Sequence, residues 1–486
     1  MGKRKKIEIT ELHAEDISSD GRAVGRNEGR AVFVKDMVPG DNARVRVFRK
    51  RKSYLEAELL ELNEASPNRI EAKCEHFAHC GGCKWQNFEY SKLVELKDRH
   101  VRTGFQKLAH WEPEVYEDII PAATHYRYRN KLEFTFSNRR WLSPEEIESG
   151  EDFEHRNAVG FHVAGMFDKV IDVHKCLLQG DEENAIRNGL RDFALEHKLS
   201  FYDIRENNGV MRNLIIRNNS SRDLLVIMVF GSENQKDIDQ VMNYLKDSFE
   251  IHSLNYIVNL KQNDSVSDQE VIYFSGETHL IEDLLGMKFR IQPKSFFQTN
   301  QEQTSKLYQV GLDYADFKED DILYDLYCGT GTIGLTAAKK VKKLIGVEYV
   351  EDAVEDAAEN AKLNGVTNAE FYAGDLKDIL NEEFVEKHGK PSVIMIDPPR
   401  AGMHKDVVEQ VRLIGADRIV YISCNPSTQA RDIELLKNDY NFLKSRAVDM
   451  FPQTSHIENV VLLKKKWSTI KTIGTGDGWT SKRVGT

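Results

Sequence analysis

A glycine-rich loop between a short apolar strand and a helix constrains the fold of this chain more than any other feature. Residues 322–327 (ILYDLY) are predicted to form a buried strand, and a G-x-G-x-x-G pattern over residues 329–334 then opens a helix. The next predicted strand, residues 343–348, ends in Glu348, 19 residues after the first glycine of the pattern. A parallel, doubly wound α/β sheet produces this arrangement, and such a loop binds a nucleotide-like cofactor.

Two cofactors fit this loop, a dinucleotide such as NAD and S-adenosylmethionine. Asp325 precedes the glycines and would repel a pyrophosphate, but it can receive the ammonium group of an amino-acid tail. Glu348 can accept hydrogen bonds from both ribose hydroxyls. Asp375 follows a third short strand and is expected to reach the adenine amino group, with a helix N-cap as its structural alternative. The acid before the glycines favours S-adenosylmethionine.

The same alternation of helices and short strands continues along the C-terminal part of the chain. Helices fit residues 299–315, 333–340, 352–364 and 405–415, and strands fit residues 322–327, 343–348, 393–397 and 418–423. This pattern predicts a Rossmann-like α/β domain.

The chain has 486 residues, too many for one domain of roughly 100–200 residues. We expect a small β-barrel over residues 1–62, an α+β central domain over residues 63–290 and the Rossmann-like domain over residues 291–466. Residues 467–486 are rich in Gly, Thr and Ser and are expected to form a mobile tail.

The first 60 residues are basic although the whole chain is acidic. They hold 14 Lys and Arg against 10 Asp and Glu, a net charge of +4, whereas 67 against 78 gives −11 for the whole chain. The Arg/Val alternation of residues 44–47 predicts a strand with one basic face, and glycines between short apolar runs predict a small antiparallel barrel. A basic face on a barrel suits a nucleic-acid backbone. The alternative is a solvated face with no partner.

A second candidate nucleic-acid surface lies in residues 126–141, where cations alternate with aromatic rings. The cations are Arg127, Arg129, Lys131, Arg139 and Arg140, and the rings are Tyr126, Tyr128, Phe134, Phe136 and Trp141. Cations beside rings can hold phosphates and stacked bases. An exposed hairpin whose rings turn inward fits this stretch equally well.

Composition excludes several classes of protein. The longest apolar run, Leu224 to Phe230, is far shorter than the roughly 18 residues of a membrane span. The basic N-terminus is not followed by the apolar segment of a secretory signal. Six cysteines in a chain of this length do not make a disulfide framework. We therefore expect a cytoplasmic protein without membrane partners.

Three cysteines, Cys74, Cys80 and Cys83, lie close together around two glycines. The glycines allow a tight turn that brings several thiolates to one centre, and Cys176 is the candidate fourth ligand. A four-cysteine set fits an iron–sulfur cluster or zinc. The spacing of the cysteines does not distinguish between these two metal groups. Two nearby histidines, His76 and His79, are possible zinc ligands, so zinc remains an alternative.

Cys424 follows a predicted strand, at the sheet edge where ligands gather in open α/β folds. A thiol beside a methyl donor suggests addition to carbon 6 of a pyrimidine, which makes carbon 5 nucleophilic enough to take the methyl group. A base must then remove the proton from carbon 5. Glu458 is the favoured candidate, and His456 is its competitor.

The stretch Asp397-Pro-Pro-Arg400 ends another predicted strand. Methyltransferases that act on exocyclic amines often carry a similar stretch with an aromatic residue in place of Arg400. The arginine therefore argues against amine methylation, and the two prolines predict a rigid wall of the pocket.

Taken together, these motifs resemble the RNA 5-methyluridine (uracil-C5) methyltransferase family over the whole chain to about Lys466. The most specific stretches are Ser295–Asn300, Asp325–Gly329, Asp397–Arg400, Ser423–Pro426 and His456–Val460. The resemblance implies that Cys424 is the nucleophile and Glu458 the proton acceptor. It also implies six residues that bind S-adenosylmethionine, namely Gln298, Tyr327, Thr332, Glu348, Asp375 and Asp397. Thr332 stands where a relative can carry Asn.

The N-terminal segment resembles a TRAM domain, a small OB-like RNA-binding barrel. The four cysteines resemble the [4Fe-4S] ligands of the branch that methylates 23S rRNA, which implies a uridine of 23S rRNA as the target of a monomeric enzyme without DNA partners. The alternatives are the same chemistry on a tRNA uridine, methylation of cytosine at carbon 5, and a non-catalytic iron–sulfur RNA-binding protein. A polar insert over residues 137–154 is longer than the resemblance predicts.

Overall fold

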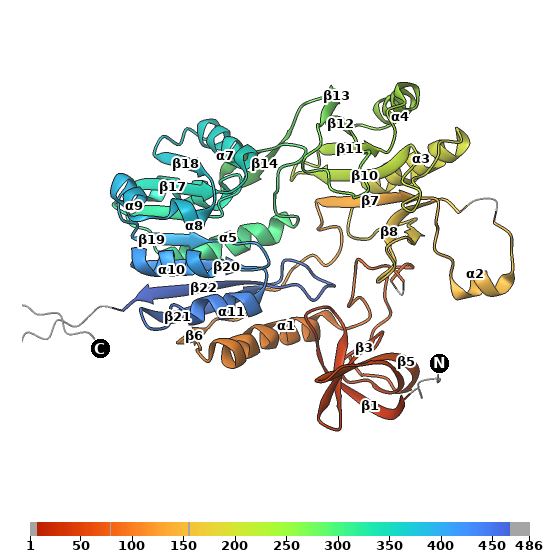
Figure 1. Ribbon diagram of the computed structural model, residues 1–486, viewed down its shortest axis with the longest axis horizontal. Helices are drawn as coiled ribbons and strands as arrows, with labels where there is room; N and C mark the ends of the chain where they lie inside the picture. The colour runs from red at the N-terminus through yellow and green to blue at the C-terminus, as the bar shows by residue number, and fades with distance from the viewer. Residues whose placement is uncertain (1–6, 78, 154–155, 467–486) are drawn as a thin grey trace, which may run out of the picture.

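The structure is a computed structural model that describes residues 7–77, 79–153 and 156–466. These residues form a closed N-terminal barrel, a seven-stranded central sheet and an eight-stranded C-terminal sheet (Figure 1). The tail expected over residues 467–486 lies outside the described residues. Within the described part of the chain, no helix has the length and apolarity needed to cross a membrane.

The barrel has five strands, joined in the order β1-β2-β3-β5-β4. They are β1 (Ile7–Ile17), β2 (Ala23–Asn27), β3 (Arg30–Lys35), β4 (Asn42–Lys50) and β5 (Tyr54–Glu64). The prediction of a wholly antiparallel barrel is wrong for one pair, because β3 and β5 run parallel. The cause is topological: β4 crosses the barrel to pair with both β1 and β5, so β5 returns beside β3 in the same direction.

The predicted basic face of the barrel carries charges of both signs. The alternation itself is confirmed, since Val45 and Val47 point into the barrel core. Each arginine of β4, however, meets a glutamate of β5, in the pairs Arg44–Glu61 (3.0 Å), Arg46–Glu58 (2.5 Å) and Arg49–Glu56 (3.5 Å). The arginines of β4 thus share their face with glutamates of β5, which the predicted basic face did not include, because local periodicity does not reveal which strand lies alongside.

The central sheet has the order β13-β12-β11-β10-β7-β8-β9. Its strands are β7 (Lys131–Ser137), β8 (Ala158–His162), β9 (Val170–Asp172), β10 (Met211–Asn218), β11 (Leu224–Phe230), β12 (Ser253–Val258) and β13 (Ile272–Gly276). One face packs against α3 (Asp181–Glu196) and α4 (Gln235–Ser248). Ile215 and Ile227 on the opposite face join the core of the C-terminal domain. Burial on both faces explains the continuous apolar sequence of β11.

The second candidate nucleic-acid surface is not a surface of exposed rings. Phe134 and Phe136 are fully buried in the core beneath α3 and α4. Three of the cations form ion pairs, Arg127 with Asp181, Arg139 with Asp203 and Arg140 with Glu146. The alternative of inward rings is therefore correct for Phe134 and Phe136, but the exposed hairpin is wrong, because β7 is an inner strand of the sheet between β10 and β8. The polar insert that follows contains the short helix α2 (Pro144–Ser149).

The C-terminal sheet confirms the predicted α/β fold, in the order β18-β17-β16-β19-β20-β22-β21-β6. Its strands are β6 (Val115–Tyr116), β16 (Ile322–Leu326), β17 (Lys343–Glu348), β18 (Ala369–Ala373), β19 (Val393–Ile396), β20 (Arg418–Ser423), β21 (Tyr440–Val448) and β22 (Glu458–Lys465). The strands from β18 to β20 are parallel, whereas β22 runs antiparallel to both of its neighbours. The end of β20 therefore meets the start of β22.

Helices cover both faces of this sheet (Figure 1). One face carries α5 (Gln301–Ala315), α6 (Thr332–Ala337), η2 (Ala338–Lys340), α7 (Glu351–Leu363) and the hairpin of β14 (Leu280–Leu284) and β15 (Met287–Ile291). The other carries α8 (Leu376–Ile379), α9 (Glu382–His388), α10 (Lys405–Ile414) and α11 (Pro426–Glu434). This two-sided cover is the doubly wound arrangement that the glycine loop predicted.

A segment that the sequence assigns to the central domain packs with the C-terminal sheet. Helix α1 (Tyr90–Gly104) continues into η1 (Phe105–Ala109), and both lie against α11. Strand β6 then pairs with β21 at the edge of the sheet. Val101 and Phe105 are buried in the same core as the strands of that sheet. The N-terminal half of the chain therefore contributes an edge strand and a covering helix to the C-terminal fold.

Candidate active site

Cys424 and Glu458 are brought together by the antiparallel pairing of β20 with β22. Ser423 lies opposite Asn459 in this ladder, so the residue after β20 and the first residue of β22 share one edge of the sheet. The turn after Cys424 is fixed by Asn425, whose backbone N–H donates to Ser423 Oγ (3.1 Å) and whose side chain donates to the carbonyl of Arg400 (3.0 Å). The thiol is therefore held on an ordered turn beside the carboxyl group.

Burial and two carboxylates keep the Cys424 thiol protonated. Burial raises its pKa to about 11, the negative charges of Glu458 and Asp397 act in the same direction, and the Arg400 guanidinium opposes them. A thiol in these surroundings is a weak nucleophile until the local charge changes. The site therefore places a partly buried thiol with a raised pKa near two acids.

Two carboxyl groups beside the thiol also hold protons unusually tightly. Glu458 is 3% exposed, and burial together with the charge of Asp397 raises its pKa well above the usual value. Burial raises the pKa of Asp397, which directly follows β19, to about 7. Clustered acids with raised pKa values are typical of sites that move protons.

Asp325, in the strand before the glycine loop, has one carboxylate oxygen without a partner. Its Oδ2 accepts a hydrogen bond from the backbone N–H of Gly334 (2.8 Å), whereas its buried Oδ1 has no partner in the described part of the chain. The residue is 1% exposed, and burial raises its pKa to about 7. An unpaired buried oxygen is costly, so this atom fits a cationic group of a ligand.

The glycine loop is shaped around the acid of the next strand. Glu348 accepts hydrogen bonds from three backbone N–H groups, those of Gly329 (3.1 Å), Tyr349 (2.8 Å) and Val350 (3.0 Å). Tyr327 has a φ of 62°, a left-handed conformation that a tyrosine rarely adopts. Such backbone strain gathers at binding and catalytic sites.

Three further candidates for cofactor binding are held as follows. Thr332 opens α6, and its hydroxyl lies 3.2 Å from the Tyr308 hydroxyl. Gln298 is partly buried, and its carbonyl accepts a hydrogen bond from the Asn130 side chain (3.1 Å). Asp375 is the N-cap of α8, accepting from the Lys377 backbone (3.2 Å) and pairing with its ammonium group (2.9 Å). The structural alternative stated for Asp375 is thus present in the fold.

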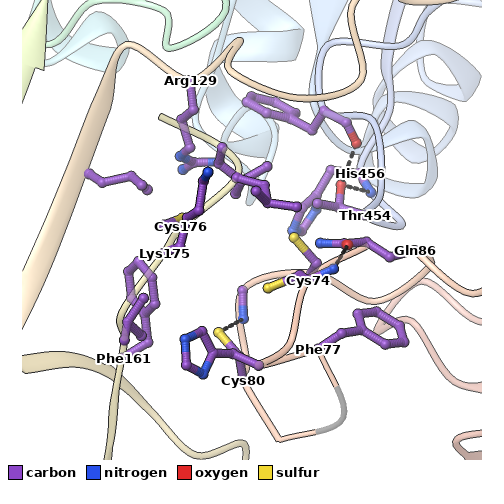
Figure 2. A pocket seen from close by; sticks show the side chains of 18 residues that line it. Cys74, Phe77, Cys80, Gln86, Arg129, Phe161, Lys175, Cys176, Thr454 and His456 are labelled. Atoms are coloured by element: carbon purple, nitrogen blue, oxygen red, sulfur yellow. Dashed lines mark hydrogen bonds between the residues drawn. The ribbon is translucent and has the colours of Figure 1, made fainter. Parts of the chain in front are cut away.

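A cavity of about 310 Å³ is lined by residues outside the glycine loop (Figure 2). All four predicted ligand cysteines, Cys74, Cys80, Cys83 and Cys176, are among its lining residues, and we call it the cysteine cavity. Burial raises the pKa of Cys80 to about 11 and that of Cys83 to about 12, and the neighbouring cysteines add to both shifts. The segment that holds these thiols is fixed by backbone donors, from Cys74 to Gln86 Oε1 (3.2 Å) and from Gly82 to Cys80 Sγ (3.4 Å).

Comparisons with known proteins agree with the methyltransferase part of this geometry. The family model described as tRNA (Uracil-5-)-methyltransferase matches residues 218–466, and the TRAM domain model matches residues 1–60. The chain belongs to the RNA uracil-5-methyltransferase family. An uncharacterized RNA methyltransferase of Bacteroides thetaiotaomicron is 45% identical to it, covering 92% of this chain and 100% of that protein. Another from Porphyromonas gingivalis is 43% identical, covering 94% of this chain and 99% of that one.

A solved structure is similar over almost the whole of this RNA uracil-5-methyltransferase. It is the Pyrococcus abyssi tRNA (uracil-54, C5)-methyltransferase in complex with S-adenosyl-L-homocysteine, with a TM-score of 0.73 and 26% identity. The match covers 93% of this chain and 100% of that one. The chain is thus an S-adenosylmethionine-dependent RNA methyltransferase with an N-terminal TRAM domain, which confirms the family, the cofactor and RNA as the partner.

The cysteine cavity of this RNA methyltransferase does not present a compact metal-binding group. In residues 7–77, 79–153 and 156–466, no set of three or more His, Cys, Asp or Glu side chains could hold a metal ion. A single zinc ion needs its thiolates to converge to about 2.3 Å from one point. Here the four thiols instead line the wall of a larger space.

One residue of the site, Tyr308 on α5, was not found from the sequence. Its pKa is raised by burial and then by the charges of three carboxylates, Asp397, Asp325 and Glu458. Its hydroxyl therefore lies among the acids of both the glycine loop and the Cys424 pocket. Tyr308 occupies the apolar stripe of a predicted helix, so its sequence pattern is that of a core residue.

Proposed function

We propose that this enzyme transfers a methyl group from S-adenosylmethionine to carbon 5 of a uridine in 23S rRNA. The observation that supports this proposal is the pairing of β20 with β22, which brings Cys424 and Glu458 to one edge of the sheet, where the charge of Glu458 helps to raise the pKa of the thiol. A nucleophile and a base at one sheet edge supply both halves of the reaction at carbons 6 and 5 of the base.

In the first half, the Cys424 thiolate adds to carbon 6 of the uracil ring, and carbon 5 gains the electron density that the methyl group requires. S-adenosylmethionine supplies an electrophilic methyl group and one positive charge. Because the pKa of the thiol is about 11 beside two carboxylates, a cation entering the pocket favours the thiolate. Thiolate formation and cofactor binding are therefore expected to be linked.

In the second half, the Glu458 carboxylate accepts the proton of carbon 5. The electrons of the C–H bond restore the double bond between carbons 5 and 6, and the bond from carbon 6 to Cys424 Sγ breaks, returning the thiolate. Burial and the charge of Asp397 raise the pKa of Glu458, which makes its ionised form a stronger base. The competing candidate for the base is His456, which lies two residues before Glu458. Its side chain is exposed, whereas that of Glu458 is buried.

The residues around the glycine loop would hold the cofactor. The unpaired oxygen of Asp325 suits the ammonium group of the methionine part, and the fixed carboxylate of Glu348 suits the ribose hydroxyls. We assign the remaining contacts to Gln298, Tyr327, Thr332, Asp375 and Asp397.

We further propose that Cys74, Cys80, Cys83 and Cys176 hold a [4Fe-4S] cluster. Four soft thiol ligands around a space of about 310 Å³ support a cluster over a single zinc ion. Methyl transfer moves no net electrons, so the cluster's role in the fold is structural or RNA-orienting.

A tRNA uridine is the second candidate substrate. The similar Pyrococcus abyssi structure is that of a tRNA (uracil-54, C5)-methyltransferase, and it matches 93% of this chain. The shared fold is therefore compatible with either RNA as the substrate. The four cysteines, which resemble those of the ribosomal branch, favour 23S rRNA.

Labelled S-adenosylmethionine with unmodified ribosomal and transfer RNA separates these candidates. Digestion and mass spectrometry would identify the labelled nucleoside. Label in 5-methyluridine of 23S rRNA alone is the expected result. The same nucleoside in tRNA alone would overturn the proposed target, label in 5-methylcytidine would overturn the proposed base, and no label from iron-loaded protein would overturn catalysis.

A further inference from the structure

The segment Asp449–Ile457, which we call the bridging loop, joins β21 to the first residue of β22, Glu458. Three of its residues, Phe451, Thr454 and His456, also line the cysteine cavity (Figure 2). One short loop therefore forms a wall of the cysteine cavity and leads directly into the proposed base.

The middle of the bridging loop is bonded to the cysteine segment. The backbone N–H groups of Lys84 and Trp85, which directly follow Cys83, both donate to the carbonyl of Gln453, at 2.8 and 3.2 Å. The Tyr128 hydroxyl donates to the carbonyl of Pro452 (3.1 Å). Gln453 has a φ of 65°, so the loop reaches these donors in a strained conformation. A change in the position of Cys83 is thereby passed to Gln453.

The start of the bridging loop is fixed by a buried ion pair. Asp449 is fully buried and accepts from the Lys97 ammonium group (2.7 Å) and the Tyr90 hydroxyl (2.8 Å) of α1. Lys97 also donates to the carbonyl of Phe451 (3.1 Å). The Gln303 side chain of α5 donates to the carbonyl of Asp449 (2.8 Å). Because breaking a buried pair is costly, this end of the loop is an immobile anchor.

The last part of the loop is braced by one hydroxyl. Thr454 Oγ1 donates to the carbonyl of Phe451 (2.7 Å) and accepts from the backbone N–H of His456 (3.1 Å). These two bonds shape the three residues that separate Thr454 from Glu458. The start of the loop is thus anchored, whereas its last residues lead directly to Glu458.

We propose that the bridging loop couples the cysteine cavity to the base, so that a filled cavity holds Glu458 in place to remove the proton from carbon 5. This inference rests on the proposed function. With the cavity emptied, Cys424 still adds to carbon 6 and the methyl group is still transferred, but proton transfer from carbon 5 to Glu458 is slowed. The bond between carbon 6 and Cys424 Sγ then persists, and the enzyme accumulates as a covalent RNA adduct.

The first test uses the full chain with its iron, and compares Thr454→Val with Ser455→Ala. The valine keeps the shape of Thr454 but removes both bracing bonds. The control removes a loop hydroxyl that donates instead to Ser19 of the barrel (2.8 Å). For Thr454→Val we expect release of 5-methyluridine to slow roughly tenfold or more, the effect of losing two partly buried hydrogen bonds, with a matching rise in gel-shifted adduct. For Ser455→Ala we expect the adduct level of the unaltered protein.

The second test compares iron-loaded and iron-depleted protein, and reads the adduct fraction together with amide hydrogen exchange. Faster exchange in residues 450–457 and more adduct after depletion are expected. Equal losses of RNA binding, addition and release, or unchanged adduct in both tests, would overturn the coupling. If the unaltered loaded protein forms neither adduct nor 5-methyluridine, the proposed function itself fails, and Cys424→Ala, which can form no adduct, marks that baseline.

Discussion

Cys424 and Cys80 have nearly the same thiol pKa, about 11, but different neighbours add to the effect of burial. Beside Cys424 the additional charges belong to carboxyl groups, Glu458 and Asp397, which can themselves take up protons. Beside Cys80 they belong to other cysteines, Cys176 and Cys74. The first arrangement suits one thiol that ionises for the length of a reaction. The second suits several thiols that ionise together and permanently around a metal group.

The comparison is tested most severely by Cys424→Ala. Loss of the nucleophile should lower methyl transfer by more than about 10⁴-fold, because carbon 5 is then not activated. Cofactor affinity and iron content should stay close to those of the unaltered protein. Transfer is measured with labelled S-adenosylmethionine and affinity by calorimetry. Turnover within a few-fold of normal would remove Cys424 from the reaction.

Glu458→Gln should separate the two halves of the reaction. The amide keeps the shape of the side chain but cannot accept the proton, so turnover should fall by about 10²–10⁴-fold while a covalent RNA adduct accumulates. Denaturing gel electrophoresis with labelled RNA detects the adduct. His456→Gln is the matched control, because it removes the competing base. If His456→Gln accumulates the adduct and Glu458→Gln does not, His456 is the base and Glu458 is not.

Cys80→Ser should affect the proposed cluster and leave Cys424, the proposed nucleophile, in place. Visible absorbance and iron content should fall strongly, and turnover should fall roughly 10- to 100-fold, the usual cost of disturbing a metal site. Cys424→Ser is the control and should keep its iron. Full iron content in Cys80→Ser, or zinc in its place, would remove the cluster assignment.

Asp325→Asn tests the part of the site that is proposed to bind the cofactor. Of these substitutions it should have the smallest effect, and that effect is on stability and cofactor binding. The folded-state pKa of Asp325, about 7, lies above the ordinary value of 3.8, so the folded protein binds this proton more tightly than the unfolded chain does. The free energy of unfolding therefore falls as the pH rises from about 4 to about 7.

Replacing this acid by the amide should accordingly raise stability at pH 8, by about 1–3 kcal/mol, while weakening S-adenosylmethionine binding. Thermal unfolding at pH 5 and pH 8 measures the first effect, which should be smaller at pH 5. The control is Asp321→Asn, which breaks the buried pair with Arg418 (2.6 Å) and should lower stability. Equal destabilisation by both variants would contradict the unpaired state of Asp325.

The sequence predicted the parts of this molecule in which chemistry and local periodicity coincide. The strands 343–348 and 418–423 have their predicted bounds, and the glycine loop lies between a strand and a helix as expected. The four cysteines were grouped from their residue type, and all four line one cavity. Such features depend on neighbours in the sequence or on the scarcity of cysteine.

Features that depend on distant neighbours were predicted poorly. The pairing of Arg46 with Glu58 joins two strands whose register local patterns do not encode, so the glutamates beside the predicted basic strand were not foreseen. The rings of Phe134 and Phe136 alternate with polar residues, and that pattern does not say which face meets another layer. The position of Tyr308 in the site also depends on distant neighbours. The three acids that raise its pKa, Asp325, Asp397 and Glu458, come from three different parts of the sequence.

The placement of β22 between β20 and β21 has a consequence for the enzyme's synthesis. In the chain, β22 comes after every other strand of the C-terminal sheet, yet it lies between two of them and carries Glu458. Until it has been translated, β20 and β21 are both left with an open edge. Under the proposed mechanism, a nascent chain that stops short of this strand contains the nucleophile Cys424. It lacks Glu458, the base that is needed before the RNA can be released from Cys424.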